Sequence, residues 1–527
     1  MCIMQNQCVN KEKSHYSGTV NGTIHVVVGG GGSHLSDFTT APPIWSIFRD
    51  RDYGFVKLTA FNHSYLLFEY KKSSDGKVYD SFTISRDYRD VLACVHDGYF
   101  SFALLSGGLS NPKLVAVSNF IAFANPKAPV YPRLAHGKSW NEMTVTWTSG
   151  YDINEVVPFV EWGPKGGKQI QSAAGTLTFN RNSMCGQPTR TVGWRDPGFI
   201  HTSFLKELWP NMRYTYRLGH FLSDGSYVWS KRYSFKASPY PGQNSLQRVI
   251  IFGDMGKIKR NGGSNYQPGS LNTTDQLIKD LDSFDIVFHI GDLPYANGYI
   301  SQWDQFTAQV QQISSTVPYM IARYATDYGM FHFCIADSEH DWREGSEQYK
   351  FIEHYLATVD RKQQPWLIFA AHRPLAYSSN DWYAEEGSFE EPMGRESLQR
   401  LWQKYKVDIG FYGHIHNYER VCPIYQNQCV NNEKSHYSGT VNGTIHVVVG
   451  GGGSHLSDFT TAPPIWSIFR DKDYGFGKLT AFNHSYLLFE YKKSSDGKVY
   501  DSFTISRDYR DVLACVHDGC VKTTLPT

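Results

Sequence analysis

The stretch RVIIFGDMG, residues 248–256, decides the fold, because an apolar run ends there in a glycine turn and a carboxylate. The pattern returns in DIVFHIGDLPYANGY (285–299), and two further apolar runs, QPWLIFAAHRP (364–374) and VDIGFYGHIHNYER (407–420), lead into histidines. Amphipathic segments typical of helices separate or follow these runs: TTDQLIKDLDSF (273–284), SQWDQFTAQVQQIS (301–314), SEQYKFIEHYLATVD (346–360) and RESLQRLWQKYKV (395–407). Alternating strands and helices predict an α/β domain with parallel strands.

Side chains of metal-ligand type stand at the ends of these predicted strands: Asp254, Asp292, His372, His414 and His416. In open α/β sheets, sites gather at the carboxyl ends of the strands, so we expect the five in one crevice. A single one would ordinarily be a turn residue, a helix cap or a buried polar group, but five together make chance a poor explanation. Two cations held close together need a bridging carboxylate, and Asp292 is the natural bridge. Tyr295 lies three residues beyond it, and a phenolate is a hard, anionic ligand suited to Fe³⁺.

The segments GDMG, GDLPYANGY, AHRP and GHIH resemble the motifs of plant purple acid phosphatases of the large type, within the calcineurin-like metallophosphoesterase superfamily. The Asp-x-Gly turn with the tyrosine is the specific part of the resemblance, which covers about residues 99–525. It implies two metals, Fe³⁺ and a divalent Zn²⁺, Mn²⁺ or Fe²⁺. It implies Asp254, Asp292, Tyr295 and His416 as ligands of Fe³⁺, and Asp292, His372 and His414 as ligands of the second metal.

The resemblance implies an acid phosphatase that hydrolyses phosphate monoesters with a metal-bound hydroxide. Its substrate would be a small phosphate ester, and its location would be secreted or vacuolar. The oligomeric state stays open between a monomer and a homodimer. Some large relatives resemble nucleotide pyrophosphatases or phosphodiesterases, which is a second enzymatic hypothesis.

Two departures from the family pattern predict impaired catalysis. The family's GNHE motif, which supplies an asparagine ligand and a phosphate-binding histidine, is absent where it would fall, between Ala322 and Arg323. We expect a strand that ends at Ile321–Ala322 and another over residues 324–333. A histidine frequent in active members is also missing, since residues 380–383 read NDWY. The Fe³⁺ site keeps its four ligands, no catalytic residue is assigned, and a pseudoenzyme that binds metal or phosphate without turnover is the third hypothesis.

The remaining segments give the expected domain organisation. Residues 128–240 contain short alternating strands with turns about every ten residues, which predicts a fibronectin III- or immunoglobulin-like β-sandwich without chemistry of its own. Residues 99–127 form a bridging segment, and residues 246–525 form the metallophosphatase domain with its C-terminal strands.

A near-identical repeat occupies both ends of the chain. Residues 5–98 match residues 426–519 except at Lys11/Asn432, Arg51/Lys472 and Val56/Gly477. Architectural repeats diverge and lie side by side, so we interpret residues 1–98 as a misplaced fragment, the tail of a neighbouring tandem gene, with unpaired sheet edges. The shared GGGGSH segment (450–455 in the second copy) lacks the lysine and helix of a P-loop and predicts a tight turn after a buried strand.

Composition limits the partners and the compartment. A formal net charge of +1 over 527 residues gives no basic field, so nucleic acid and membrane are not expected partners. Sequons at Asn272, Asn442 and Asn483, besides those at Asn21 and Asn62, favour export, but the first residues contain no apolar core of signal-peptide length. Cys422 and Cys429 bracket a short loop, and a disulfide and free thiols are equally compatible with the sequence.

Overall fold

The computed structural model describes residues 125–257, 266–321, 324–375, 377–379, 397–426, 428–460 and 462–508. Nearer the N-terminus it describes residues 2–4, 7–8, 14–17, 23–24, 26–28, 34–38, 46–62, 65–85, 99–100, 103–106, 113–117 and 121–122. The chain divides into two compact units, Met1–Pro126 with Arg260–Gly263, and Lys127–Lys259 with Ser264–Thr527. The candidate ligands therefore all belong to the second unit.

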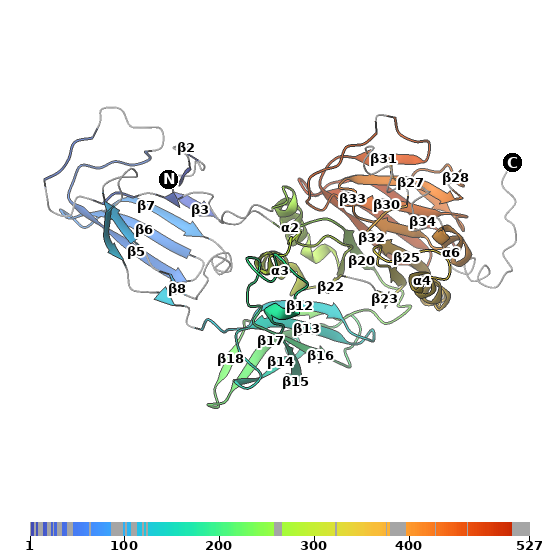
Figure 1. Ribbon diagram of the computed structural model, residues 1–527, viewed down its shortest axis with the longest axis horizontal. Coiled ribbons are helices and arrows are strands. Elements are labelled where there is room, and N and C mark those ends of the chain that lie inside the picture. Colours follow the sequence, from blue (N-terminus) through green and yellow to red (C-terminus); the bar gives the residue numbers. More distant parts are fainter. Residues whose placement is uncertain are drawn as a thin grey trace. The chain divides into compact units, whose positions relative to one another are not determined.

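The first unit is built of strands (Figure 1, blue). Its main sheet has the order β3-β7-β6-β5, formed by β3 (His15–Ser17), β5 (Gly54–Asn62), β6 (Tyr65–Lys72) and β7 (Val78–Ser85). Shorter pairings join β1 (Cys2–Met4) to β2 (Gln7–Cys8) and β4 (Thr23–Ile24), β8 (Tyr99–Phe100) to β11 (Ile121–Ala122), and β9 (Ala103–Ser106) to β10 (Lys113–Val117).

The second unit begins with an all-β sandwich, as predicted. Its strands are β12 (Val130–His136), β13 (Met143–Ser149), β14 (Val156–Pro164), β15 (Ile170–Leu177), β16 (Phe199–Leu205), β17 (Arg213–Leu222), β18 (Tyr227–Trp229) and β19 (Tyr233–Lys236). Along β13, buried and half-buried residues alternate, because successive side chains of a strand point to opposite faces. The inner faces enclose a core that includes Trp147, Trp162 and Tyr216. The Tyr216 hydroxyl donates to the Ser315 carbonyl oxygen at 2.8 Å, which ties the sandwich to the following domain.

The α/β part that follows the sandwich contains two sheets that enclose one apolar core. The first has the order β22-β21-β20-β32-β33-β34-β29, formed by β20 (Gln247–Phe252), β21 (Ile286–His289), β22 (Tyr319–Met320), β29 (His436–Ser438), β32 (Gly475–Asn483), β33 (Tyr486–Lys493) and β34 (Val499–Ser506). The second has the order β23-β24-β25-β26-β30-β27-β28, formed by β23 (Tyr324–Tyr328), β24 (Phe331–Ile335), β25 (Trp366–Ala371), β26 (Ile409–Tyr412), β27 (Tyr418–Tyr425), β28 (Gln428–Cys429) and β30 (Thr444–Val449). β31 (Ser467–Asp471) pairs with β27.

Helices cover the outer faces of both sheets. α2 (Ser270–Lys279) and α3 (Ile300–Ser314) pack with β20 and β21 in one apolar cluster. α4 (Glu347–Ala357) and α6 (Leu398–Tyr405) pack over β25 in another, as Figure 1 shows. The strands β20, β21 and β22 run parallel, and so do β24, β25, β26 and β30. The predicted α/β class with parallel strands is confirmed.

One predicted strand is wrong. Residues 324–333 form two antiparallel strands, β23 and β24, instead of a single one, and the chain turns between them at Gly329 and Met330. Gly329 has φ +55°, a left-handed conformation that favours glycine, and a Cβ there would lie 2.3 Å from the Gln247 side chain. A tight reversal therefore interrupts the apolar run. Ala322 and Arg323, between which the family motif would fall, lie outside the described residues.

The two copies of the repeat form the same local sheet with different surroundings. β3 pairs in parallel with β7 in the first copy, just as β29 pairs with β34 in the second. Phe476 and Leu479 of the second copy are fully buried, whereas their counterparts Phe55 and Leu58 are 50% and 53% exposed. Among the described residues, β5 is an edge strand, as expected, while its counterpart β32 pairs with β20.

Gly477 lies where the second copy joins the larger sheet, opposite Ile251 of β20. A Cβ on Gly477 would lie 2.9 Å from Phe489 Cε2 and 3.3 Å from Ile251 Cγ2. The absence of a side chain therefore allows β32 to pack closely between its neighbours. The first copy has Val56 at the equivalent position.

Candidate metal centre

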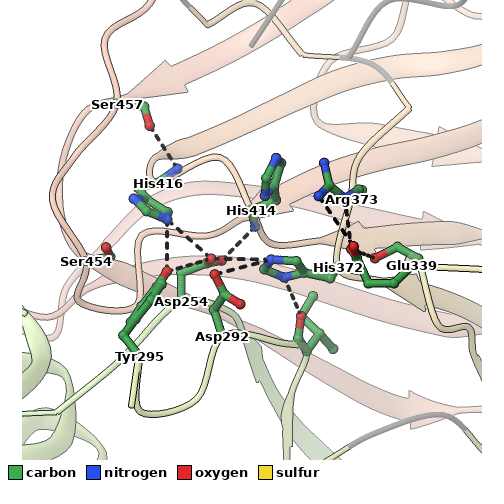
Figure 2. Close-up of polar contacts among 12 residues, drawn as sticks. Asp254, Asp292, Tyr295, Glu339, His372, Arg373, His414, His416, Ser454 and Ser457 are labelled. Carbon is green, nitrogen blue, oxygen red and sulfur yellow. Dashed lines mark hydrogen bonds and ion pairs between the residues drawn. The ribbon is translucent and has the colours of Figure 1, made fainter. Parts of the chain in front are cut away.

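The candidate ligands come from loops at the carboxyl ends of parallel strands in both sheets. Asp254 and Asp292 follow β20 and β21, His372 directly follows β25, and His414 and His416 follow β26. The two sheets approach each other at this end, and a Cβ on Gly253 would lie 3.0 Å from Gly413 Cα. Figure 2 shows the side chains converging from the loops of both sheets, as the sequence predicts.

Asp254 is the centre of the cluster and is fully buried. Its Oδ1 lies 3.1 Å from the Tyr295 hydroxyl, 3.3 Å from His416 Nε2 and 3.8 Å from His372 Nε2. Its Oδ2 accepts a hydrogen bond of 2.7 Å from the His414 backbone N–H. One carboxylate thus faces four of the predicted ligand residues.

Asp292 lies between the two groups of histidines and is 41% exposed. Its Oδ2 is 3.5 Å from His372 Nε2. Ligand atoms of Asp292, Asp254 and His416 also lie within 4.8 Å of one another, a spacing that a metal ion could occupy. Asp292 therefore reaches both sides of the cluster, which is the position a bridging carboxylate needs.

Backbone carbonyls orient two of the imidazoles. His372 Nδ1 lies 3.1 Å from the Ile290 carbonyl oxygen, and His416 Nδ1 lies 2.9 Å from that of His455. A carbonyl oxygen accepts only, so each Nδ1 carries a proton and donates, and each Nε2 faces the carboxylates. Metal-binding histidines commonly have such a partner on the second nitrogen. The His414 ring packs against that of His372 with centroids 5.3 Å apart.

Tyr295 completes the cluster. Its hydroxyl donates to Asp254 Oδ1 and lies 3.0 Å from His416 Nε2. Burial raises the pKa of the Tyr295 phenol far above its ordinary value, and the charges of Asp254 and Asp292 raise it further. The phenol therefore keeps its proton unless a strong cation replaces it.

Electrostatic coupling between His372 and its carboxylates is strong. Burial by itself would lower the pKa of His372, but Asp254 and Asp292 outweigh it and raise that pKa to about 9. Burial opposes ionisation of Asp292 too, yet its hydrogen bond to His372 and the charge of that residue hold the Asp292 pKa at about 2. Such a concentration of negative charge in a largely buried cluster favours a bound cation.

Four of the cluster residues have left-handed backbone conformations. The φ angles are +60° at Asp254, +45° at Asp292, +48° at Tyr295 and +67° at His414. Such residues cost on the order of 1–3 kcal/mol each and persist where the surrounding structure enforces them. They gather at functional sites, because the strained turn is what points the side chain inward.

The glycine loop after β30 packs directly against the Asp254 turn. β30 is fully buried, as predicted, and Gly450 follows it. A Cβ on Gly450 would lie 2.2 Å from the Ile415 carbonyl oxygen and 3.0 Å from Asp254 Oδ2, and one on Gly452 would lie 2.2 Å from the Gly253 carbonyl oxygen. These glycines let the loop's backbone approach the cluster, a role that the local sequence did not reveal.

No motif in the sequence indicates a role for Arg373, and the segment DSEHDW (337–342) is compatible with Glu339 near the crevice or in a capping or core role. Glu339 is 62% exposed, which excludes the core, and its Oε1 accepts a 2.8 Å hydrogen bond from Arg373 Nε. The pair is far apart in sequence, so only the parallel pairing of β24 with β25 brings it together. The segment NDWY (380–383) lies outside the described residues.

Features outside the cluster can be placed as well. Asn272, Asn442 and Asn483 are exposed, as glycosylation requires, and Asn21 lies outside the described residues. Cys422 and Cys429 form a disulfide. Among the described residues, no helix is long and apolar enough to cross a membrane.

Three family models match the chain. The "Purple acid Phosphatase, N-terminal domain" matches residues 129–237, and the "Calcineurin-like phosphoesterase" matches residues 311–418. The "Iron/zinc purple acid phosphatase-like protein C" model matches both residues 22–81 and residues 443–502. The doubly matched model thus covers both copies of the repeat.

Individual relatives agree with these matches. "Probable inactive purple acid phosphatase 27" of Arabidopsis thaliana is 69% identical over 471 residues, which cover 81% of this chain and 77% of the relative. A "Nucleotide pyrophosphatase/phosphodiesterase" of Hordeum vulgare is 66% identical over 58% of this chain and 95% of its own length. The structure of purple acid phosphatase PPD1 from yellow lupin (Lupinus luteus) seeds aligns with a TM-score of 0.75 and 60% identity, covering 87% of this chain and 88% of that one. The chain belongs to the purple acid phosphatase family.

Proposed function

We propose that this chain is a metal-dependent acid phosphatase that hydrolyses small phosphate monoesters at a dinuclear centre, with impaired turnover. The observation that carries the proposal is the convergence on Asp254, whose Oδ1 lies within 4 Å of Tyr295, His372 and His416. A buried carboxylate with a phenol and two imidazoles on one oxygen is a set of donors that suits a bound cation.

The donor types fit the expected metals. We assign Asp254, Asp292, Tyr295 and His416 to Fe³⁺, and Asp292, His372 and His414 to a divalent Zn²⁺, Mn²⁺ or Fe²⁺. Carboxylates, phenolate and imidazole suit these ions, and the exposed Asp292 reaches toward both groups of ligands. When bound, such metals would bind the phosphate and lower the pKa of a coordinated water.

The chain's own residues prepare the site for a metal ion. The carbonyl groups of Ile290 and His455 fix the two Nε2 atoms toward the carboxylates, so the imidazole ligands need no reorientation. His372 carries a proton near neutral pH in the absence of metal, because its pKa is raised to about 9, and it must release that proton before its Nε2 can coordinate. Metal uptake should therefore be proton-linked.

Impaired turnover is proposed because the GNHE motif is absent from the sequence. The divalent site then lacks one ligand, and the phosphate lacks a histidine that would face it. Relatives at 64–69% identity are named "Probable inactive" purple acid phosphatases, which agrees with weak or absent catalysis here.

The test is metal analysis, visible absorption and turnover of p-nitrophenyl phosphate on the same preparation. We expect bound iron, a visible charge-transfer band, and turnover lower by several orders of magnitude than that of an intact family member. Full turnover would contradict the impairment, and a protein that binds no metal would contradict the assignment altogether.

A second candidate is phosphodiester or pyrophosphate hydrolysis, which the name of the barley relative favours. Parallel assays with a nucleotide sugar and with p-nitrophenyl phosphate separate the two. A protein that binds metal or phosphate without hydrolysing either substrate would be the pseudoenzyme.

We also propose that the protein is secreted or vacuolar. The Cys422–Cys429 disulfide and the exposed sequon asparagines support an oxidising compartment. Glycosidase treatment of protein isolated from plant tissue tests this, with a loss of apparent mass expected. The oligomeric state, monomer or homodimer, is to be measured on the same material.

A further inference from the structure

An arginine and a glutamate form an ion pair beside the candidate metal ligands. Arg373 directly follows His372 at the end of β25, and Glu339 lies in the loop after the neighbouring β24. Arg373 Nε donates to Glu339 Oε1 at 2.8 Å, and Nη2 lies 3.5 Å from Oε2. Figure 2 shows the pair on the side of the cluster formed by His372 and His414. A guanidinium group therefore stands next to two proposed ligands of the divalent metal.

The ion pair is exposed and contributes little to folding. The Arg373 and Glu339 side chains are 28% and 62% exposed, and pairs of that kind contribute about 0–1 kcal/mol. The loop that carries Glu339 has other attachments: Trp342 Nε1 donates to the Ser338 carbonyl oxygen, and Gln348 Nε2 donates to that of Asp337. These two hydrogen bonds hold the loop in addition to the ion pair.

Glu339 also belongs to the electrostatic surroundings of the site. The Arg373 guanidinium lowers the pKa of Glu339 most, and the charges of His372 and His414 lower it further. The carboxylate therefore stays ionised and lies close enough to both imidazoles to feel their charge. An anion that reached this side of the cluster would meet the guanidinium and compete with that carboxylate.

We propose that Arg373 binds the phosphoryl group of the ligand, and that Glu339 holds the guanidinium beside the site by occupying it in the absence of phosphate. This inference rests on the proposed function, and it adds a phosphate-binding residue that the ligand set does not include. A planar guanidinium can donate two parallel hydrogen bonds to two phosphate oxygens, just as it does to a carboxylate. The guanidinium carries the same positive charge whether it binds the Glu339 carboxylate or a phosphate, so it can exchange one anion for the other.

The proposal predicts different effects on phosphate binding for substitution of the two partners. Arg373→Ala removes the donor and should weaken phosphate binding about tenfold. Glu339→Gln removes the competing negative charge, keeps an acceptor for Arg373, and should leave phosphate binding unchanged or tighten it. Arg373→Lys keeps the charge without the paired donors and should fall between wild type and Arg373→Ala. If the ion pair were purely structural, Arg373→Ala and Glu339→Gln would change the phosphate affinity in the same direction.

The experiment is calorimetric titration of inorganic phosphate into the full chain at pH 5.5, after the metal content of each variant has been measured. Arg343→Ala is the matched control, because Arg343 forms an exposed ion pair with Asp341 in the same loop. This variant should bind phosphate like wild type.

Three results would overturn the assignment: wild-type affinity in Arg373→Ala, equal weakening in Arg373→Ala and Glu339→Gln, or no phosphate binding by the wild-type protein. Turnover does not enter the comparison, so a protein that binds metal and phosphate without hydrolysis still tests Arg373. Lack of metal in the wild-type protein contradicts the proposed function separately, and the same titrations on that protein still decide the role of Arg373.

Discussion

Asp254 organises the site at the level of single residues. It is fully buried, it faces Tyr295, His372 and His416 through one oxygen, and it accepts the His414 backbone N–H through the other. An isolated buried carboxylate in such a position would be costly, so the surrounding donors stabilise it, and the proposed cation would stabilise it further. The other candidate ligands have different proposed roles, which substitution can separate.

Tyr295→Phe removes the phenol and leaves the carboxylates and imidazoles. We expect the protein to retain iron, because three of its four proposed Fe³⁺ ligands remain, and to lose the visible band that phenolate-to-iron charge transfer produces. Absorption spectroscopy with metal analysis measures both. Tyr299→Phe, in the same segment, is the control, since its side chain is 37% exposed and Tyr299 lies outside the cluster. An unchanged band in Tyr295→Phe would remove Tyr295 from the ligand set.

At the scale of elements, the loop of Gly450–Gly453 holds the Asp254 turn. The Ser454 N–H donates to the Asp254 carbonyl oxygen at 2.9 Å, and the Gly253 N–H donates to that of Val449 at 3.0 Å. The four glycines are therefore a packing surface for the turn that carries Asp254. The role depends on contacts between segments about 200 residues apart.

Gly452→Ala should damage the site through this packing. The added Cβ would lie 2.2 Å from the Gly253 carbonyl oxygen, so the backbone next to Asp254 must move. We expect a loss of about 1–3 kcal/mol in the free energy of unfolding and reduced metal content, measured by denaturant unfolding and metal analysis. Gly31→Ala, the same substitution in the first copy, is the control and should leave metal content unchanged. Equal metal loss in both variants would contradict this role.

The pattern of apolar runs ending in Asp or His made both the α/β class and the convergence of five candidate ligands predictable. The details required the folded chain. Two aspartates follow two strands, and nothing local shows that Asp254 is the buried one and Asp292 the exposed one. The reversal at Gly329 is hidden within an apolar run, and the Arg373–Glu339 pair depends on strand order, which periodicity does not encode.

At the scale of the whole molecule, buried neutral histidines make stability depend on pH. In the sandwich, burial lowers the pKa of His201 to about 4, while burial and the charge of His201 lower that of His220 to about 3. His220 Nε2 accepts a 3.0 Å hydrogen bond from Trp147 Nε1, and His201 Nε2 lies 2.8 Å from Ser149 Oγ. In mild acid the folded chain therefore keeps both imidazoles neutral, whereas in the unfolded chain they take up protons.

Acid should therefore destabilise the protein. An unfolded histidine has a pKa of about 6.5, so between that pH and about 4 the unfolded chain binds more protons than the folded chain. The free energy of unfolding should fall in this window as the pH is lowered, by up to about 1.4 kcal/mol per pH unit for each such histidine. Denaturant unfolding from pH 4.5 to 7 measures the slope of the free energy of unfolding against pH, which reports how many more protons the unfolded chain binds. His220→Gln, which keeps an acceptor for Trp147, should reduce that number by about one proton. An identical slope in wild type and variant would contradict the role of His220.

The glycine at position 477 has a consequence for the order in which the chain is made. During synthesis the first copy emerges before β20, and the second copy emerges only after it, so a growing chain offers β20 the earlier copy first. A duplicate that fitted equally well would be a kinetic trap. Val56 replaces Gly477 in that copy, and a Cβ at this position would lie 3.3 Å from Ile251 Cγ2 of β20, so we expect the first copy to fit β20 less closely. A single side chain should thus favour the later of two nearly identical copies as the partner of β20.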